Sequence, residues 1–372
     1  MDLPAWAPTL TDGVVTLRPH RPEDADAVVA QCHDPQMQRW TTVPAPYERR
    51  HAEEWLSDRP REWAQGTNLA LAVESGGAYC GSVDLRPDGA RGASIGYGLG
   101  PWARGRGVLD RALRLLLPWG FDVLDLEVVH WQAVAGNWPS RRAAWRVGFR
   151  FEGTQRSLLP GRGTRYDAWV GSLLRGEPLE PASAWLDAPV LDGERVRLRP
   201  YRPVDVPRVV EACRDPVTRH WLSSLPAGYA ADDARAHLEH IAEEAAAGRS
   251  LSWAIADPGD DRLLGEVGLY GLVEFGRSVE VAYWSHPAER GRGVMTAAVR
   301  LAARHALVPV DVGGLGRSRL VLRAAEHNQA SRRVAVRAGF LMTGRDRQAE
   351  LLGDGTVDDL VRFDLLATEL PG

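Results

Sequence analysis

The hexapeptide ERGRGV, from Glu289 to Val294, decides the fold because it occurs a second time as ARGRGV, from Ala103 to Val108. The two copies lie half the length of the 372-residue chain apart. Each follows a segment of β-strand character and precedes a helical stripe of apolar residues. Glycines let the backbone approach an anion closely, and the unpaired N–H groups at a helix start attract one. Both loops are therefore predicted to bind phosphate.

Apolar residues after each loop recur at i, i+3, i+4 and i+7, which predicts an amphipathic helix. The stripes are Leu109, Ala112, Leu113, Leu116 and Leu117 in the first copy and Val294, Ala297, Ala298, Leu301 and Ala302 in the second. Pro118 should end the first of these helices.

The repetition extends over whole domains. Asp12–Trp40 aligns with Asp192–Trp221, and Asn137–Gly153 aligns with Asn328–Gly344. A period of about half the chain indicates a duplicated domain. The proline-containing, polar stretch Leu173–Gly193 suits the connection between the copies. We therefore expect a first domain at 1–178, a linker at 179–189 and a second domain at 190–372.

Each half is predicted to have the element order β-α-α-β-β-β-α-β-α-β-β, which is a mixed-sheet α/β (α+β) fold. Asp24 and Asp205 fall just inside a helix start, where a carboxylate favours the helix dipole. The N-terminus has no signal-peptide pattern, and no apolar run is long enough to cross a bilayer. These features predict a cytoplasmic protein.

Composition excludes several functions. The net charge of −4 gives no case for binding nucleic acid or an anionic membrane. All 45 basic residues are arginine, so a Walker A loop and a Schiff-base lysine are excluded. Three scattered cysteines form neither a disulfide framework nor a metal motif. No metal is therefore expected, and the pair His237 and His240 is interpreted as a solvated helix face.

The combination of motifs resembles the GNAT superfamily of acyl-CoA-dependent N-acyltransferases, in a tandem two-domain form. An Arg-x-x-Gly-x-Gly/Ala loop before a helix is followed by Asn-x-x-Ser and Gly-Phe. The opening Leu-Arg-Pro segment and the Tyr-Trp strand end are similar to the ribosomal-protein N-terminal acetyltransferases. This resemblance implies two acyl-CoA N-acyltransferase domains with acetyl-CoA as co-substrate, and a splayed fourth strand whose N–H meets the thioester oxygen.

Position by position, the resemblance implies a CoA site in each copy. In the second copy it comprises Tyr283, Trp284, Arg290, Gly291, Arg292, Gly293, Val294, Met295 and Asn328. In the first copy it comprises Arg104, Gly105, Arg106, Gly107, Val108 and Asn137. The family usually has a small residue two places past the last motif glycine, where this chain has Met295 and Leu109.

Two residues of the second copy are predicted to be catalytic. Glu280 is the candidate base that deprotonates the amine, with Glu266 as the alternative. Ser331 is the candidate donor to the leaving sulfur, or else a helix cap. The first copy has Ser94 and Ser82 in place of the two glutamates. We therefore expect the second domain to be the working one.

Other side chains near the expected site are weaker candidates. His286 and His327 lie on loops, and for most of the 14 tryptophans core packing is a better interpretation than an acceptor groove. The proposed groove comprises Trp221, Tyr229, Trp253 and Trp284.

The predicted function is transfer of an acetyl group from acetyl-CoA to an amine, on a small molecule or a peptide N-terminus. Three alternatives stay open: two active sites with different acceptors, a non-catalytic acyl-CoA-binding or regulatory protein, and a scaffold. Relatives with one domain often form dimers, and two fused copies would reproduce such a dimer contact within one chain. The chain itself could then be monomeric. The sequence does not identify the acceptor.

Overall fold

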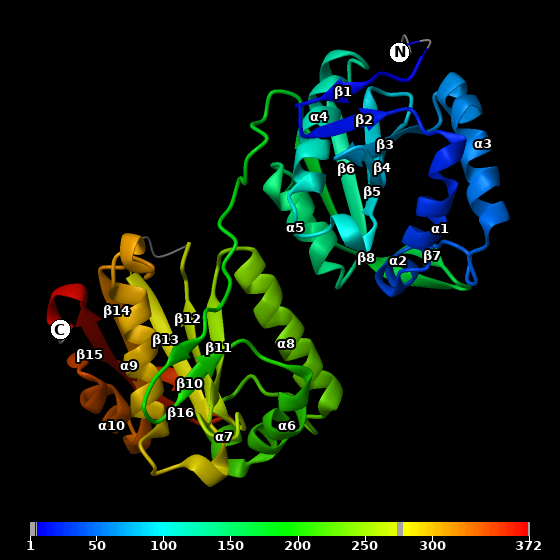
Figure 1. Ribbon diagram of the computed structural model, residues 1–372. Coiled ribbons are helices and arrows are strands. Elements are labelled where there is room, and N and C mark those ends of the chain that lie inside the picture. The colour runs from blue at the N-terminus through cyan, green and yellow to red at the C-terminus, as the bar shows by residue number, and fades with distance from the viewer. Residues whose placement is uncertain (1–3, 5, 274–277, 371–372) are drawn as a thin grey trace. The chain divides into compact units, whose positions relative to one another are not determined.

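The structure is a computed structural model that describes residue 4 and residues 6–273 and 278–370. The chain divides into two compact units, Met1–Ala182 (unit 1) and Ser183–Gly372 (unit 2). Each unit contains an eight-stranded mixed sheet with helices on both faces (Figure 1). In the described part of the chain, no helix has the length and apolar character that a membrane span requires.

Unit 1 has the strand order β1-β2-β3-β4-β5-β6-β8-β7. Its strands are β1 (Leu10–Thr11), β2 (Val15–Arg18), β3 (Leu69–Ser75), β4 (Ala78–Pro87), β5 (Gly92–Leu99), β6 (Val128–Val134), β7 (Arg150–Gly161) and β8 (Thr164–Leu174). Its helices are α1 (Ala25–Cys32), α2 (Pro35–Trp40), α3 (Arg49–Gln65), α4 (Val108–Asp122) and α5 (Trp138–Arg146).

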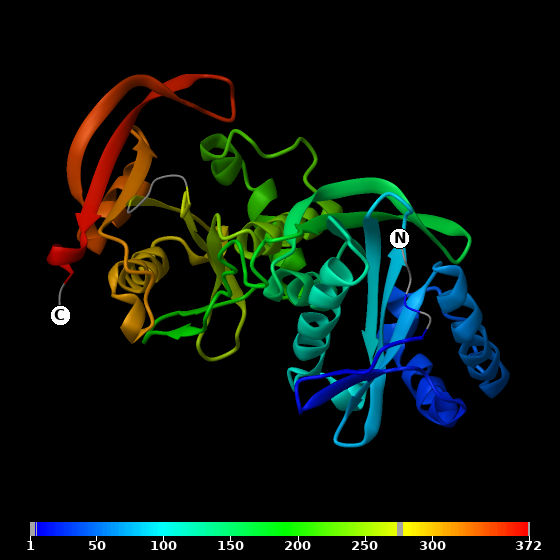
Figure 2. The same ribbon diagram turned by 90° about the horizontal axis from the view of Figure 1, so that it is seen from above.

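Unit 2 repeats this topology, with the order β15-β16-β14-β13-β12-β11-β10-β9. Its strands are β9 (Leu191–Asp192), β10 (Arg197–Arg199), β11 (Leu251–Ala256), β12 (Leu263–Tyr270), β13 (Ser278–Ser285), β14 (Arg319–Ala325), β15 (Leu341–Leu351) and β16 (Val357–Leu366). Its helices are α6 (Val206–Arg214), α7 (Pro216–Trp221), α8 (Ala231–Ala246), α9 (Val294–Leu307) and α10 (Gln329–Ala338). The long β15–β16 hairpin extends beyond the rest of its sheet (Figure 2).

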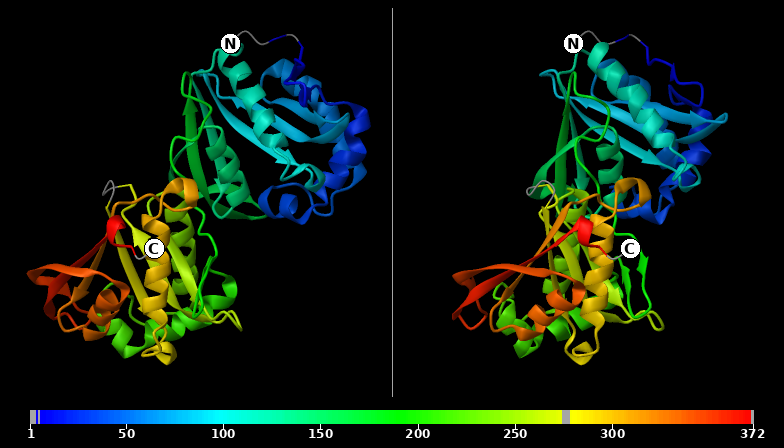
Figure 3. Two further views of the ribbon diagram at one scale, coloured as in Figure 1. Left: turned by 60° about the vertical axis from the view of Figure 1, so that its left-hand side comes forward. Right: turned by 90° about the vertical axis from the view of Figure 1, so that its left-hand side faces the viewer.

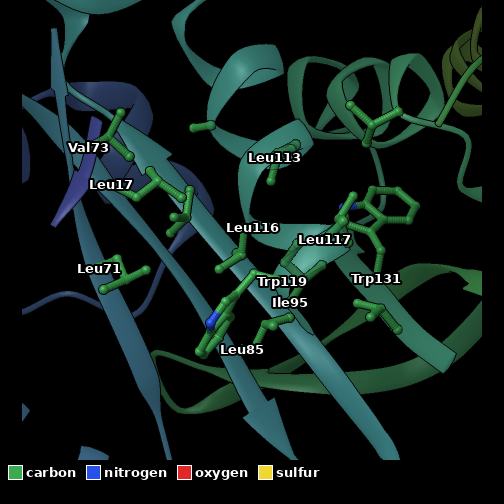
Figure 4. Close-up of a cluster of buried hydrophobic side chains, with 14 of the residues drawn as sticks. Leu17, Leu71, Val73, Leu85, Ile95, Leu113, Leu116, Leu117, Trp119 and Trp131 are labelled. Carbon is green, nitrogen blue, oxygen red and sulfur yellow. The ribbon is translucent and has the colours of Figure 1, made fainter. Parts of the chain in front are cut away.

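The main core of each unit lies between its sheet and the helix that follows the RGRG loop. In unit 1 the predicted stripe of α4 packs on alternate residues of β2 to β5, with Leu113, Leu116 and Leu117 fully buried (Figure 4). In unit 2, α9 lies along the sheet in the same way (Figure 3). The opposite face is covered by α1 and α3 in unit 1 and by α6 and α8 in unit 2. Each sheet is therefore the middle layer of a three-layer unit.

A buried ion pair joins the second strand of each unit to its first helix. Arg199 donates both terminal nitrogens to the Asp205 carboxylate at 2.8 and 2.9 Å, and their side chains are 1% and 3% exposed. Arg18 and Asp24 form the same pair in unit 1. Asp24 and Asp205 therefore act chiefly as buried partners of arginine. The sequence-based prediction, which gave them only an interaction with the helix dipole, was incomplete.

Three local predictions were wrong. Helix α4 does not stop at Pro118 but continues to Asp122, because Trp119 and Phe121 of its last turn are buried in the core. The predicted element order omitted α2 and α7, which Asp34 and Asp215 begin as N-caps just before a proline. It also omitted the two-residue strands β1 and β9.

The segment predicted as a linker at 179–189 is packed at both of its ends. Leu179 packs against the core of unit 1, whereas Leu186 and Ala188 pack against the core of unit 2. The carbonyl of Pro189 accepts a hydrogen bond from the Trp253 indole at 2.8 Å. The two ends of the predicted linker are therefore part of the packed units.

Candidate active site

In both units, two neighbouring parallel strands separate before they end. The register of β13 with β14 covers three residue pairs and stops at Glu280 opposite Val321, although both strands continue. The register of β5 with β6 stops in the same way at Ser94 opposite His130. The strand separation that the family resemblance implied is therefore present in both units.

Backbone N–H groups of β13 point into this opening. The N–H of His286 donates to the Leu264 carbonyl at 2.9 Å, on the side of β12. Because N–H directions alternate along a strand, the N–H of Trp284 points the same way, and those of Tyr283 and Ser285 point to the other side. The opening thus presents hydrogen-bond donors that can polarise a carbonyl oxygen.

The RGRG loops begin the helices at the end of each opening. Gly291 and Gly293 have φ of 75° and 77°, and Gly105 and Gly107 have φ of 72° and 73°. This left-handed conformation is strained for residues with a Cβ, which explains the glycines. The second glycine of each loop is the N-cap residue, so the first N–H groups of α9 and α4 remain available to an anion.

The two arginines of each loop have different environments. Arg290 donates to Asp215 at 2.5 Å and to Thr218 at 2.8 Å, which fixes the loop to α7. Burial raises the pKa of Asp215, but the hydrogen bonds from Arg290 and Thr218 together with the charge of Arg290 outweigh this, and the pKa lies below its usual value. Arg292 is 65% exposed and bonds only to Glu289 among the described residues, at 3.0 Å. The first arginine therefore braces the loop, while the second faces solvent.

A cavity of about 280 Å³ lies at the loop of unit 2. Arginines from two elements contribute to its wall, Arg290 from the loop and Arg333 and Arg337 from α10. Met295 and Trp221 supply apolar surface. A ligand with phosphate groups and an apolar arm matches this lining.

Tyr283 and Ser331 join β13 to α10 beside this cavity. The Tyr283 hydroxyl is 3.0 Å from Ser331 Oγ, and burial raises the pKa of Tyr283 to about 12. The Asn328 side chain accepts the Ser331 N–H at 3.0 Å and is the N-cap of α10. Asn328 is therefore the helix cap, and the Ser331 hydroxyl remains a partner of a neutral phenol.

The two predicted carboxylates are both engaged. Glu280 forms a two-oxygen ion pair with Arg323 of β14, in which the nitrogen Nε lies 2.9 Å from Oε1. Glu266 is 3% exposed and accepts hydrogen bonds from Tyr201 at 2.6 Å and from His237 at 2.8 Å. Burial raises the pKa of Glu266, but His237 and the hydrogen bond from Tyr201 together hold it below its usual value. Neither carboxylate is a free proton acceptor in this arrangement.

Glu350 on β15 is a carboxylate that the sequence analysis missed. Burial raises its pKa, Arg323 opposes the rise and Glu280 adds to it. None of the described residues forms a hydrogen bond or ion pair with it. Its position after a β-bulge, opposite Asp358, brings it near Arg323 and Glu280, and no local motif in the sequence marks it.

The histidines and aromatic residues have defined places. His237 bonds to Glu266, so its predicted place on a solvated helix face was wrong. His286 bonds to Glu211 at 3.0 Å and His327 to Asp358 at 2.8 Å. Trp221 and Trp284 line the cavity, whereas Tyr229 and Trp253 are buried in the core. The described residues contain no group of histidine, cysteine or carboxylate side chains that could hold a metal.

Unit 1 has neutral residues where unit 2 has its charged ones. Ser94 replaces Glu280, Gln132 replaces Arg323 five residues before the cap asparagine, and Leu159 replaces Glu350 after the same bulge. At the RGRG loop the difference is reversed. The third residue of α4 is Asp110, and that of α9 is the neutral Thr296, which lines the cavity.

The GNAT acetyltransferase domain model matches residues 15–150 and again residues 195–341. The putative ribosomal N-acetyltransferase YdaF of Bacillus subtilis is 34% identical over 129 residues, which are 34% of this chain and 70% of that protein. The ribosomal-protein-serine acetyltransferase of Escherichia coli is 26% identical over 27% of this chain and 52% of its own. The solved structure of Mycobacterium smegmatis RimJ with CoA-disulfide is 26% identical and covers 47% of this chain and 90% of its own, with a TM-score of 0.42.

The chain thus belongs to the GNAT acetyltransferase family and contains its domain twice. It is an N-acetyltransferase that takes the acetyl group from acetyl-CoA and passes it to an amine.

Proposed function

We propose that unit 2 carries out the acetyl transfer and that its acceptor is the α-amino group of a peptide. The observation that carries this proposal is the charged trio Glu280, Arg323 and Glu350 at the acceptor face, which unit 1 replaces with neutral residues. The acceptor class rests on the names of the relatives, two of which are ribosomal acetyltransferases.

Acetyl-CoA supplies an acetyl group activated as a thioester. In the proposed mechanism, Glu350 accepts a proton from the ammonium group of the acceptor, because a carboxylate with a raised pKa is a stronger base. Glu280 holds the Arg323 side chain in place through their ion pair, so that the positive charge of Arg323 stays close to Glu350. The N–H groups of β13 polarise the thioester oxygen, and the Ser331 hydroxyl, positioned by Tyr283, donates a hydrogen bond to the leaving sulfur as the amine nitrogen replaces it on the acetyl carbon.

For CoA binding in unit 2, we propose the loop Arg290, Gly291, Arg292, Gly293 and Val294, together with Met295, Asn328, Arg333 and Arg337. Arg333 and Arg337 were missed in the sequence analysis, although Arg333 belongs to the repeated Ser-Arg-Arg pattern. The corresponding loop of unit 1, Arg104 to Val108, is proposed to bind CoA weakly because Asp110 places a carboxylate on the first turn of α4, where Arg114 pairs with it at 3.0 Å and compensates its charge only in part. One chain would then contain one working site, with no need for a second copy.

Placing the unit 1 residue in unit 2 tests this difference. The substitution Thr296→Asp is expected to raise the dissociation constant of acetyl-CoA by at least about tenfold, because the new carboxylate repels the phosphate groups. Calorimetric titration with acetyl-CoA measures this change. The matched substitution Asp110→Thr in unit 1 should leave the transfer rate unchanged. An unaltered dissociation constant for T296D would contradict the placement of CoA in unit 2.

A further inference from the structure

Unit 1 contains a large cavity on the sheet face opposite α4. Its volume is about 570 Å³, and it lies between β4 and β5 on one side and α1, α2 and α3 on the other. Its floor consists of Ser82, Gly96 and Gly98. The size falls in the range of cavities that hold small organic ligands.

Small residues of unit 1 create this cavity. Ser82 lies opposite Gly98 in the register of β4 and β5, and the same position in unit 2 pairs Glu266 with Trp284. In unit 2 these two large side chains occupy the space between the sheet and the helices. The cavity therefore exists because unit 1 has a hydroxymethyl group and a glycine where unit 2 has a carboxylate and an indole.

The cavity wall combines aromatic rings with an excess of negative charge. The rings belong to Tyr47, Trp55 and Tyr79. Three lining carboxylates, Glu54, Asp58 and Asp84, face a single lining arginine, Arg86. A cation with an attached aromatic group complements both features, through charge and through contact with ring faces.

Asp84 is the carboxylate best placed to meet such a ligand. Its side chain is 18% exposed, and its Oδ1 accepts a hydrogen bond from Arg86 at 2.6 Å. A Cβ built on Gly96 would lie 2.2 Å from Arg86 Nη2 and 2.3 Å from Asp84 Oδ2, so the ion pair of Asp84 and Arg86 rests directly on the glycine floor. None of the described residues donates a hydrogen bond to Oδ2, which leaves it for a ligand.

The histidine behind the floor does not supply a competing charge. His20 is 1% exposed in its side chain and lies 3.1 Å from Ser82 Oγ through Nε2. Burial lowers its pKa to about 3, with further lowering by Arg59 and Arg18 and an opposite effect of Asp24. His20 is therefore neutral at physiological pH, and the carboxylates dominate the field in the cavity.

We propose that this cavity is a binding site for an arylalkyl ammonium ligand, held by Asp84 and by the surrounding aromatic rings. The ligand is bound and not acetylated there, because Ser94, Gln132 and Leu159 replace the charged trio. Unit 1 is then a ligand-binding module attached to the transferase unit. This proposal is tested by binding alone, so it succeeds or fails independently of the proposed catalytic role of unit 2.

The test is calorimetric titration of the full chain with tryptamine, with indole-3-propionate as the anionic ligand of similar shape. Tryptamine is expected to bind at least about tenfold more tightly than indole-3-propionate. The propionate lacks the ammonium group that donates a charge-assisted hydrogen bond to Asp84, and its own carboxylate is repelled by the carboxylates of the cavity. The substitution Asp84→Asn should weaken tryptamine binding by at least about tenfold. Asp122→Asn, which changes an exposed carboxylate elsewhere in unit 1, should have no effect.

A second variant tests the cavity itself. Gly98→Trp introduces the residue of unit 2 and should abolish tryptamine binding, since the nearest obstacle to a new Cβ is the flexible end of Met37 at 2.8 Å. If this variant does not fold, the comparison of D84N with D122N still decides the question. The proposal is overturned if tryptamine does not bind, if D84N binds it as the wild type does, or if E350Q in unit 2 abolishes the binding instead.

Discussion

Replacing Glu350 by glutamine is expected to lower kcat/KM for the amine acceptor by about 100-fold or more while leaving the KM for acetyl-CoA unchanged. The loss follows from the removal of the general base, whose contribution is typically of this size. The substitution keeps the shape of the side chain and removes only its ability to accept the proton. The measurement is the initial rate of CoA thiol release, first at saturating acetyl-CoA with increasing peptide and then at saturating peptide with increasing acetyl-CoA.

The pH dependence provides a second readout of the same variant. Because burial raises the pKa of Glu350, the wild-type rate should fall on acidification at a higher pH than an ordinary glutamate would give. E350Q should lose this acidic limb. The matched variant Leu159→Gln in unit 1 should retain both the rate and the profile. If E350Q keeps most of the activity and Glu280→Gln loses it, the base is Glu280, as the sequence analysis expected.

Replacing Arg199 by alanine is expected to lower the unfolding free energy of unit 2 by about 3–5 kcal/mol. The substitution leaves the Asp205 carboxylate, which is 3% exposed, without its two-nitrogen partner. A buried charge that has lost its partner is far more costly than the pair was favourable. The hydrogen bonds to Asp205 raise the pKa of Arg199 above its usual value, although burial opposes the rise.

The measurement is urea unfolding of the full chain, followed by circular dichroism. Since the chain has two units, the curve should be fitted with two transitions, and only one should shift. Arg197→Ala on the same strand is the control, because its partner Asp192 is exposed and the pair should contribute nothing measurable. If R199A and R197A lowered the unfolding free energy equally, the burial of the Arg199–Asp205 pair would not be the cause of the loss.

The fold could be predicted largely from the sequence because the information was local and repeated. The RGRG loops, the apolar stripes and the Asn-x-x-Ser pattern are each set by a few neighbouring residues, and each occurs twice. The extension of α4 past Pro118 could not be predicted in this way, because it depends on the burial of Trp119 and Phe121 against distant strands.

The candidate site was predictable only on the CoA side. The loop glycines and Asn328 carry motifs, whereas Arg323 and Glu350 lie on strands without any local signature. They come together through the pairing of β14, β15 and β16, which single-sequence periodicity does not specify. Glu266 illustrates the opposite error, since its strand position suggested a base and its hydrogen bonds to Tyr201 and His237 make it a structural carboxylate.

The central claim, that unit 2 performs the transfer, is tested most directly by disabling one loop at a time. The measurement is the initial rate of CoA thiol release with a peptide that has a free N-terminal serine, and the same peptide with a blocked N-terminus is the blank. The double variant R290A/R292A should lose nearly all activity, and R104A/R106A should retain the wild-type rate. Loss of activity in R104A/R106A with survival of R290A/R292A would contradict the account.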